Sequence, residues 1–155
     1  MNWLPGTAVS TAPSTVSCAG ATALPLDELR AAAARVIPNH AAFDGFTDAA
    51  LDSAASELGV EPAVLRVAFP DGAVGMVDAW FAAVDADMAA VLPPASLAAI
   101  KIRARITALV MARLKLLAPH RESLRRALAV LALPANLPTA ARLGWRAADA
   151  MWRLA

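Results

Sequence analysis

The stretch that decides the fold is residues 52–69, DSAASELGVEPAVLRVAF. Its first half has the alanine-rich composition of a short helix, and Gly59 can end that helix in the left-handed conformation that glycine adopts without strain. Pro62 then suits the first turn of a second short helix, PAVLRVAF, where no backbone N–H donor is needed. Two short helices separated by a tight glycine-containing turn predict a helix-turn-helix.

Length and composition indicate that this motif belongs to one all-α domain. A chain of 155 residues suits a single domain, and its 59% hydrophobic content is rich in alanine, the strongest helix former. The single cysteine, Cys18, excludes an intramolecular disulfide. Residues 1–26 carry no charge and are rich in Ala, Ser, Thr, Pro and Gly. We therefore expect a disordered leader over residues 1–23 and a helical domain over residues 24–155.

Helix caps and helix breakers predict about seven helices. Pro38 should end the first helix, and the Thr47 hydroxyl should cap the second by accepting unpaired backbone N–H groups. The predicted helices cover residues 27–37, 47–58, 62–69, 73–92, 96–118, 121–133 and 139–155. Stripes expected to be buried on the two longest are Val77, Trp80, Phe81, Val84, Met88 and Val91, and Ile102, Ile106, Leu109, Val110, Leu114 and Leu117. This layout resembles the tetracycline-repressor (TetR) family, which implies a TetR-like helical bundle with an N-terminal helix-turn-helix layer.

Charge is divided unevenly between the two halves of the chain. Residues 1–92 contain three basic and eleven acidic residues, a net charge of −8, whereas residues 93–155 contain eleven basic and two acidic residues, a net charge of +9. DNA-binding proteins gain affinity by neutralising phosphates, and they read bases with Arg, Lys, Asn or Gln. The helix that would read DNA offers Arg66 alone, beside Glu61. We therefore expect no nucleic-acid binding, and a TetR-like transcriptional regulator is the alternative function.

Residue spacing gives no indication of catalysis or metal binding. His40 and His120 stand 80 residues apart, and neither has a second histidine or cysteine three or four residues further on. The sequence has no glycine-rich phosphate loop and no GxSxG motif. Asp78, Asp85 and Asp87 lie on one predicted helix, where only Asp78 and Asp85 share a face, and we interpret this as a solvated acidic face. We expect a protein without catalytic residues, metal or cofactor.

The predicted last helix carries an apolar stripe edged by arginines. Asp149 is placed to pair with Arg146 or Arg153, at three or four residues' separation. Either the stripe packs into the core or it offers a Met and Trp surface to a partner helix or to lipid. The stripe comprises Leu137, Ala141, Gly144 or Trp145, Ala148, Trp152 and Ala155, with Met151 at its edge.

Four segments resemble a specific family, the ubiquinone-biosynthesis accessory proteins that include the ninth protein of the coenzyme Q pathway. Its members have a TetR-like fold. The strongest part of the resemblance is ALALPANLP followed by the D-x-M-W pattern of Asp149, Met151 and Trp152. The segments are FDGFTDAALDSAASELGV (43–60), FPDGAVGMVDAW (69–80), KIRARITALVMARLKLLAPHRESLRRALAVLALPANLP (101–138) and LGWRAADAMWRLA (143–155).

The resemblance implies a non-enzymatic lipid-binding protein that presents isoprenoid quinone intermediates to the demethoxyubiquinone hydroxylase. It also implies peripheral attachment to the inner face of a bacterial cell membrane from the cytoplasm, and we expect a homodimer. Family members continue past the tryptophan into further helices, so the C-terminal helices are expected to be missing here. The residues expected to face the hydroxylase are Asp149, Met151 and Trp152, bordered by Arg146 and Arg153. Periodicity alone suggests, as residues in contact with an isoprenoid quinone or phospholipid, Trp80, Val84, Ile106, Val110, Leu114, Leu131 and Trp145.

Overall fold

Helices make up all the regular secondary structure in residues 25–155, the part of the chain that the computed structural model describes. Seven α-helices have at least seven residues and α5 is a single turn, which confirms the predicted all-α class with about seven helices. The leader predicted over residues 1–23 lies outside the described residues. The α-helices are α1 (Leu26–Asp44), α2 (Asp48–Leu58), α3 (Pro62–Ala68), α4 (Gly72–Val91), α5 (Pro94–Leu97), α6 (Ile102–Leu117), α7 (Arg121–Leu131) and α8 (Leu137–Leu154).

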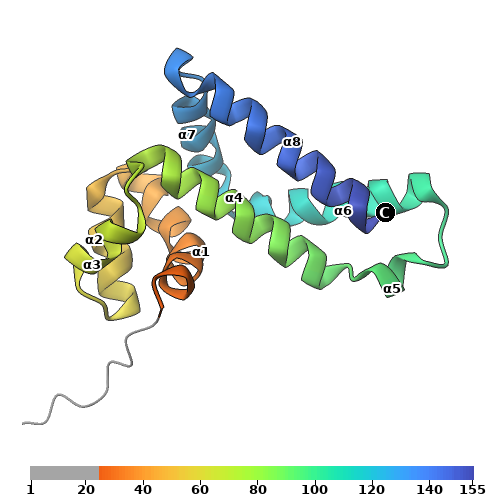
Figure 1. Cartoon of the computed structure of the whole chain (residues 1–155), viewed down its shortest axis with the longest axis horizontal. Coiled ribbons are helices and arrows are strands. Elements are labelled where there is room, and N and C mark those ends of the chain that lie inside the picture. Colours follow the sequence, from red (N-terminus) through yellow and green to blue (C-terminus); the bar gives the residue numbers. More distant parts are fainter. Residues whose placement is uncertain (1–24) are drawn as a thin grey trace, which may run out of the picture.

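The first three helices form a layer at one end of the molecule (Figure 1). Gly59 ends α2 in the left-handed region, with φ of 67°, and Pro62 begins α3, so the two helices and their turn form as predicted. Leu51 and Leu65, one on each helix, are buried in the same core as Ile37 of α1. This layer is joined to the rest of the molecule through α1 and α4, which pack against each other.

α1 does not end at Pro38, and that part of the prediction is wrong. The helix continues to Asp44 with the proline inside it. Proline removes one helical hydrogen bond, but the buried face of α1 continues past it, because Ile37, Pro38 and Ala41 are all buried. The Ser123 hydroxyl of α7 also donates a hydrogen bond to the Pro38 carbonyl oxygen. Tertiary packing therefore outweighs the local preference of proline.

Two helix starts also differ from the prediction. Thr47 precedes α2 as expected, but its hydroxyl donates a hydrogen bond of 3.1 Å to the Asp44 carbonyl oxygen and does not cap the helix. The helix predicted over residues 96–118 is divided into α5 and α6. The guanidinium of Arg105 donates hydrogen bonds to the carbonyl oxygens of Ala98 and Ile100, at 2.9 and 2.7 Å. These bonds stabilise the segment that connects α5 to α6. Residue spacing alone had predicted one continuous helix there.

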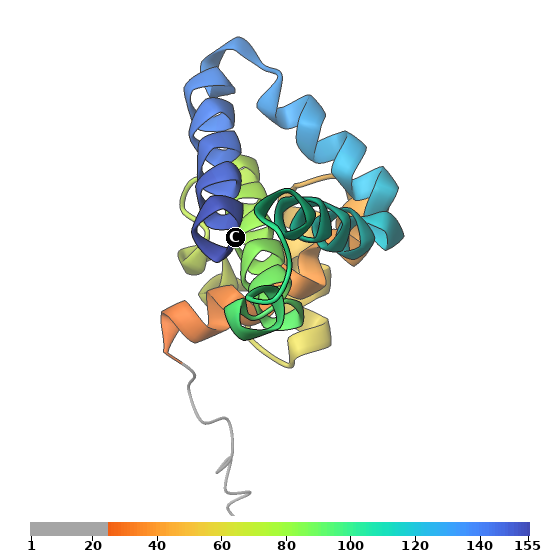
Figure 2. The same ribbon diagram turned by 90° about the vertical axis from the view of Figure 1, so that its right-hand side faces the viewer.

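The long helix α4 is the centre of the C-terminal half, and α6, α7 and α8 all pack against it (Figures 1 and 2). Five residues of its predicted stripe are buried, and the sixth, Val91, is exposed. The stripe predicted on α6 is mostly wrong, because α6 buries Leu109, Ala112 and Leu117 and leaves its other side uncovered. The exposed or partly exposed members of that stripe are Ile102, Ile106, Val110 and Leu114.

α7 and α8 are connected by a short 3-10 helix (Pro134–Asn136) and diverge from it (Figure 2). The Asn136 side chain donates a hydrogen bond of 2.8 Å to the Val130 carbonyl oxygen, which ties this connection to the end of α7. Leu131 of α7 and Leu143 of α8 both reach the main core. The two helices therefore meet near their connection and leave a space between them further along.

Candidate functional site

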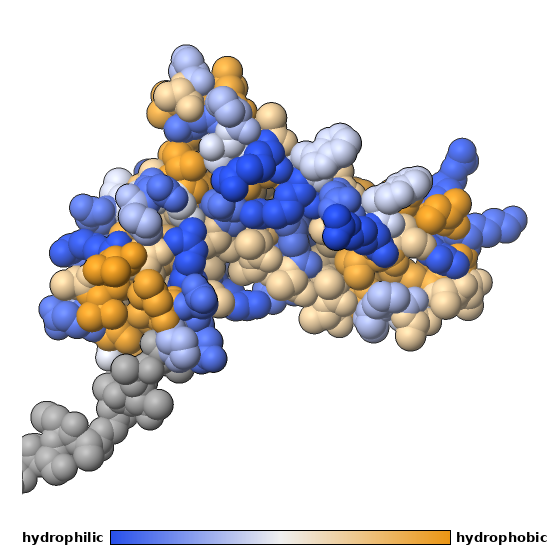
Figure 3. All heavy atoms as spheres, viewed as in Figure 1, coloured by the Kyte–Doolittle hydropathy of each residue, from blue (hydrophilic) through white to orange (hydrophobic). Residues whose placement is uncertain are grey.

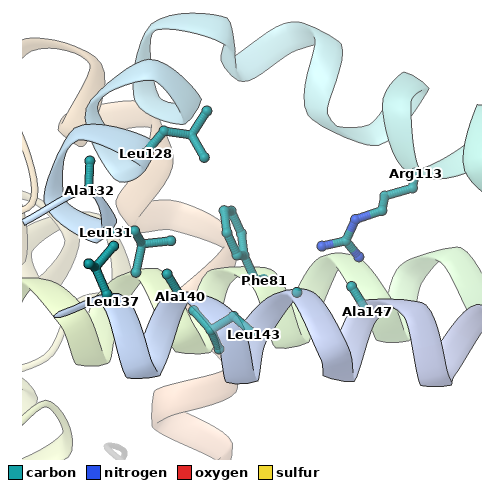
Figure 4. Close-up of a pocket in the computed structure, with 10 residues that line it drawn as sticks. Phe81, Arg113, Leu128, Leu131, Ala132, Leu137, Ala140, Leu143 and Ala147 are labelled. Atoms are coloured by element: carbon teal, nitrogen blue, oxygen red, sulfur yellow. The ribbon is translucent and has the colours of Figure 1, made fainter.

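The space between α7 and α8 is an apolar groove of about 460 Å³ (Figure 4). Phe81 of α4 lies at its centre, and Arg113 of α6 reaches it from one end (Figure 4). The volume lies within the range of small-molecule sites, roughly 300–1,000 Å³. The lining residues, which we call the α7–α8 groove, are Phe81, Arg113, Leu128, Leu131, Ala132, Leu137, Ala140, Leu143, Gly144 and Ala147.

The groove has a buried floor and an exposed rim. Phe81, Leu131 and Leu143 of the floor belong to the main hydrophobic core. Leu128 and Leu137 of the rim are each 54% exposed. An apolar groove that is open along its rim and anchored in a fixed core can accept an apolar chain without unfolding any element.

Charged residues close the end of the groove beside α6. Arg113 forms an ion pair with Asp85 of α4, and the two side chains are only 15% and 12% exposed. Arg146 of α8 lies 3.6 Å from the second oxygen of Asp85 and donates a hydrogen bond of 2.5 Å to Asp78. Arg142 also pairs with Asp78, at 3.3 Å. These five residues, which we call the charge cluster, tie α4, α6 and α8 together.

The charge cluster overturns the solvated acidic face that we predicted for α4. Asp85 is almost completely buried and Asp78 is 22% exposed, whereas Asp87 lies on the surface and pairs with Arg35. Burial lowers the pKa of Arg113 from its ordinary value, and the nearby positive charge of Arg146 lowers it further. Arg113 is therefore a cation in a partly dry setting, where an additional negative charge would be stabilising.

The apolar stripe predicted on the last helix exists but faces outward. Trp145 and Trp152 are 78% and 69% exposed, and together with Ala148 and Asp149 they line a shallow hollow of about 280 Å³. Asp149 pairs with Arg153 at 2.9 Å, one of the two predicted pairings. α8 packs instead through Leu143 and Ala147, on the opposite side of the helix. Trp145 and Trp152 are about two helical turns apart and form an exposed aromatic face.

Two residues expected on this aromatic face lie elsewhere. Met151 is partly buried and packs against the second core cluster, which includes Met88 and Leu109. Arg146 turns its guanidinium toward Asp78 and Asp85 of α4. Both positions follow from the rotation of α8, which the ion pairs to α4 hold in place. Asp149, Trp152 and Arg153 remain together on the surface.

The residues predicted to contact lipid are not brought together. Trp80 and Val84 are core residues, and Trp80 stacks on Phe46 with ring centroids 5.9 Å apart. Leu131 alone lines the α7–α8 groove. The others are spread over the uncovered side of α6 and the outer face of α8: Ile106, Val110, Leu114 and Trp145. Periodicity did not identify Phe81, Arg113 and Gly144 as residues that could contact lipid. Their common position in the groove depends on the angle between the helices.

The helix-turn-helix surface is acidic and apolar. The only basic residue of α3, Arg66, is paired with Asp52 of α2. Phe43, Val64 and Val67 are exposed on α1 and α3, and apolar side chains gather over this layer at the lower left of Figure 3. A phosphate backbone would meet no free cation on α3, and it would lie against acidic and apolar side chains there.

Within residues 25–155, no three His, Cys, Asp or Glu side chains come together as a metal site. In the same residues no single helix is long and apolar enough to cross a membrane, and two bent pairs of helical segments reach that length only jointly. The chain matches no protein-family model, and no curated protein is significantly similar to it in sequence.

Proposed function

We propose that this chain is a non-enzymatic lipid-binding accessory protein of ubiquinone biosynthesis, which presents isoprenoid quinone intermediates to the demethoxyubiquinone hydroxylase. The observation that carries the proposal is the α7–α8 groove, in which nine of the ten lining residues are apolar. The assignment to ubiquinone biosynthesis comes from the resemblance of the D-x-M-W pattern and of ALALPANLP to that family. The resemblance of the layout to TetR-like bundles is consistent with it. The groove supplies a place where an isoprenoid chain can leave water.

Two further surfaces fit this proposal. The aromatic face of α8, with Trp145 and Trp152, has the exposed tryptophans that dominate binding energy at many protein interfaces, so we assign it to the hydroxylase. The uncovered side of α6 combines exposed apolar residues such as Met111 and Leu114 with Lys115. A surface of this kind suits peripheral contact with anionic lipid at the inner face of a bacterial membrane, or the second subunit of a homodimer.

Lipid extraction tests the proposal. The full chain is purified without detergent, extracted with organic solvent and analysed by mass spectrometry. We expect isoprenoid quinones or phospholipids in stoichiometric amount, because an empty groove of this size leaves apolar surface exposed to water, which is unfavourable. A protein of similar hydropathy purified in parallel corrects for carried-over lipid. An extract without lipid from the folded chain would remove the basis of the proposal.

Truncation of Trp152 is expected to weaken hydroxylase capture without affecting the fold. A buried interface tryptophan commonly contributes about 2 kcal/mol or more, so Trp152→Ala should weaken binding by roughly thirtyfold. Because the side chain is 69% exposed, the thermal midpoint should change by less than about 2 °C. The measurement is a pull-down titration with the demethoxyubiquinone hydroxylase. Phe43→Ala, which truncates an 83% exposed aromatic on α1, is the matched control and should bind like the wild type.

The alternative, a TetR-like DNA-binding regulator, is favoured only by the helix-turn-helix arrangement of α2 and α3. Because Arg66 is held by Asp52 and its neighbours are acidic, we expect no gel shift with DNA from upstream of the protein's own gene, even at low salt. A salt-sensitive shift that Arg66→Ala abolishes would reverse this choice.

A further inference from the structure

Arg113 is the only charged residue among the ten that line the α7–α8 groove. Its guanidinium enters the groove from α6, at the end beside Ala147, while Leu128 and Leu137 lie toward the other end (Figure 4). From Leu137 to Ala147 the groove follows α8 for about 15 Å, at 1.5 Å per residue. The groove is therefore polar at one end and apolar along the rest of its length, which is the arrangement that an amphiphile requires.

Most of the hydrogen-bonding capacity of Arg113 is unused. A guanidinium carries five N–H donors, and in the described part of the chain Arg113 makes one hydrogen bond, to Asp85. Its side chain lines the groove and is 15% exposed, and none of its nitrogen atoms is among the fully buried atoms without a partner, so the remaining donors reach solvent at this end of the groove. Asp85 holds the guanidinium in place and leaves the other donors available to a ligand.

The charge cluster has one more positive than negative charge, since three arginines face two aspartates. Within it, the second oxygen of Asp85 and the Nε of Arg146 are buried without a hydrogen-bond partner in the described residues. The excess charge belongs to Arg142, whose side chain is 64% exposed, so the less exposed part of the cluster is balanced in charge. The unpaired N–H donors of Arg113 are therefore what favours an anionic oxygen over a neutral one.

We propose that the α7–α8 groove selects a single-chain amphiphile whose head carries an anionic oxygen, with Arg113 binding that oxygen and the chain lying toward Leu128 and Leu137. This inference rests on the proposed lipid-binding function and ranks the ligands of the groove: an amphiphile with an anionic head binds more tightly than one with a neutral head, such as a quinone. The groove has a volume of about 460 Å³, which suits one short alkyl chain. The shared chemistry is an anionic oxygen on an apolar chain, and it can come from a carboxylate or from a phosphate monoester.

Calorimetric titration of the delipidated wild-type chain with matched amphiphiles tests the inference without any mutation. The probes are dodecanoate, dodecyl phosphate and dodecan-1-ol, each below its micelle concentration, with acetate and inorganic phosphate as heads without a chain. A charge-assisted hydrogen bond should make at least one anionic probe roughly tenfold to a hundredfold tighter than the alcohol. Acetate and inorganic phosphate should not bind detectably. The stronger of the two anionic probes identifies the head.

Variants of Arg113 locate the selectivity. Arg113→Lys keeps the charge but loses the planar fork, so the preference for the anion should fall several-fold. Because removing Arg113 alone leaves Asp85 buried without its partner, the neutral variant combines Arg113→Met with Asp85→Asn, and its preference should vanish while the alcohol still binds. Arg103→Met, an exposed cation on the same helix, is the control and should behave like the wild type.

The outcomes separate the inference from the function on which it rests. Equal affinity for the anionic probes and the alcohol would overturn the inference and leave lipid binding standing. The same is true if the preference survives in the neutral double variant. Failure of every amphiphile to bind the folded chain would overturn both.

Discussion

Gly144→Leu is expected to empty the α7–α8 groove of lipid while making the protein harder to unfold. Gly144 lines the groove, and no atom lies within 4 Å of the position that its Cβ would occupy. The backbone there has no positive φ, so a larger side chain fits the helix. Replacing glycine inside a helix stabilises it by about 0.5–1 kcal/mol. The added side chain fills the space that a lipid chain would occupy, so lipid recovered by extraction should fall at least tenfold.

Opposite changes in stability and in lipid content make this prediction specific. A substitution that merely damaged the fold would lower both, whereas this one should raise the thermal midpoint of the lipid-free protein by roughly 2–5 °C. Ala104→Leu is the matched control, because Ala104 is exposed on α6 and lies outside the groove. It should leave lipid content unchanged. If Gly144→Leu retains wild-type lipid, the ligand lies elsewhere, and the hollow beside Trp145 and Trp152 becomes the next site to block.

Local signals in the sequence were sufficient for the turn between α2 and α3. Gly59 and Pro62 have conformational preferences that act within one turn, and both define helix ends as expected. Pro38 shows where such signals fail. Its local cost is smaller than the gain from burying Ile37 and Ala41 on the continuing face of α1, and no local rule includes that gain.

The rotation of α8 could not be predicted from periodicity. The helix has one apolar stripe through Trp145 and Trp152 and another through Leu143 and Ala147. Large aromatic residues suggest that the first stripe is buried, but the second stripe packs against the rest of the protein. Arg146 helps to fix the rotation of α8, because this rotation brings its guanidinium to Asp78, 68 residues away in the sequence.

The groove is a property of three-dimensional arrangement, because its residues come from α4, α6, α7 and α8 and from the connection before α8. Apart from Arg113 and from Ala132 in the connection, each of them, taken alone, is an ordinary apolar or small residue on a helix. Their common position depends on how far α7 and α8 diverge, which side-chain spacing does not encode. Leu131 was therefore the one lipid candidate that coincides with the groove.

Asp85→Ala is expected to destabilise the protein by about 3–5 kcal/mol, since it leaves Arg113 buried without its partner. Stabilities of single domains are typically about 5–15 kcal/mol, so this loss is a large fraction of the total. The thermal midpoint should fall by roughly 10 °C or more. The same variant also removes the ion contact to Arg146, so α8 should loosen from α4 and the Gly144 amide should exchange hydrogen faster. Urea unfolding followed by circular dichroism gives the free energy, and hydrogen exchange gives the local effect.

Asp87→Ala provides a stringent control from the same helix, two residues further on. Asp87 also forms an ion pair, with Arg35 at 2.6 Å, but the two side chains are 39% and 49% exposed. Water replaces most of the interaction when an exposed pair is broken, so this variant should cost less than about 1 kcal/mol. Two aspartates of equal charge on one helix then differ in burial and in the second ion contact, to Arg146, that Asp85 makes. Equal losses from the two variants would mean that Asp85 is solvated in solution, and Arg113 would then lack the partly dry setting on which its preference for an anionic head depends.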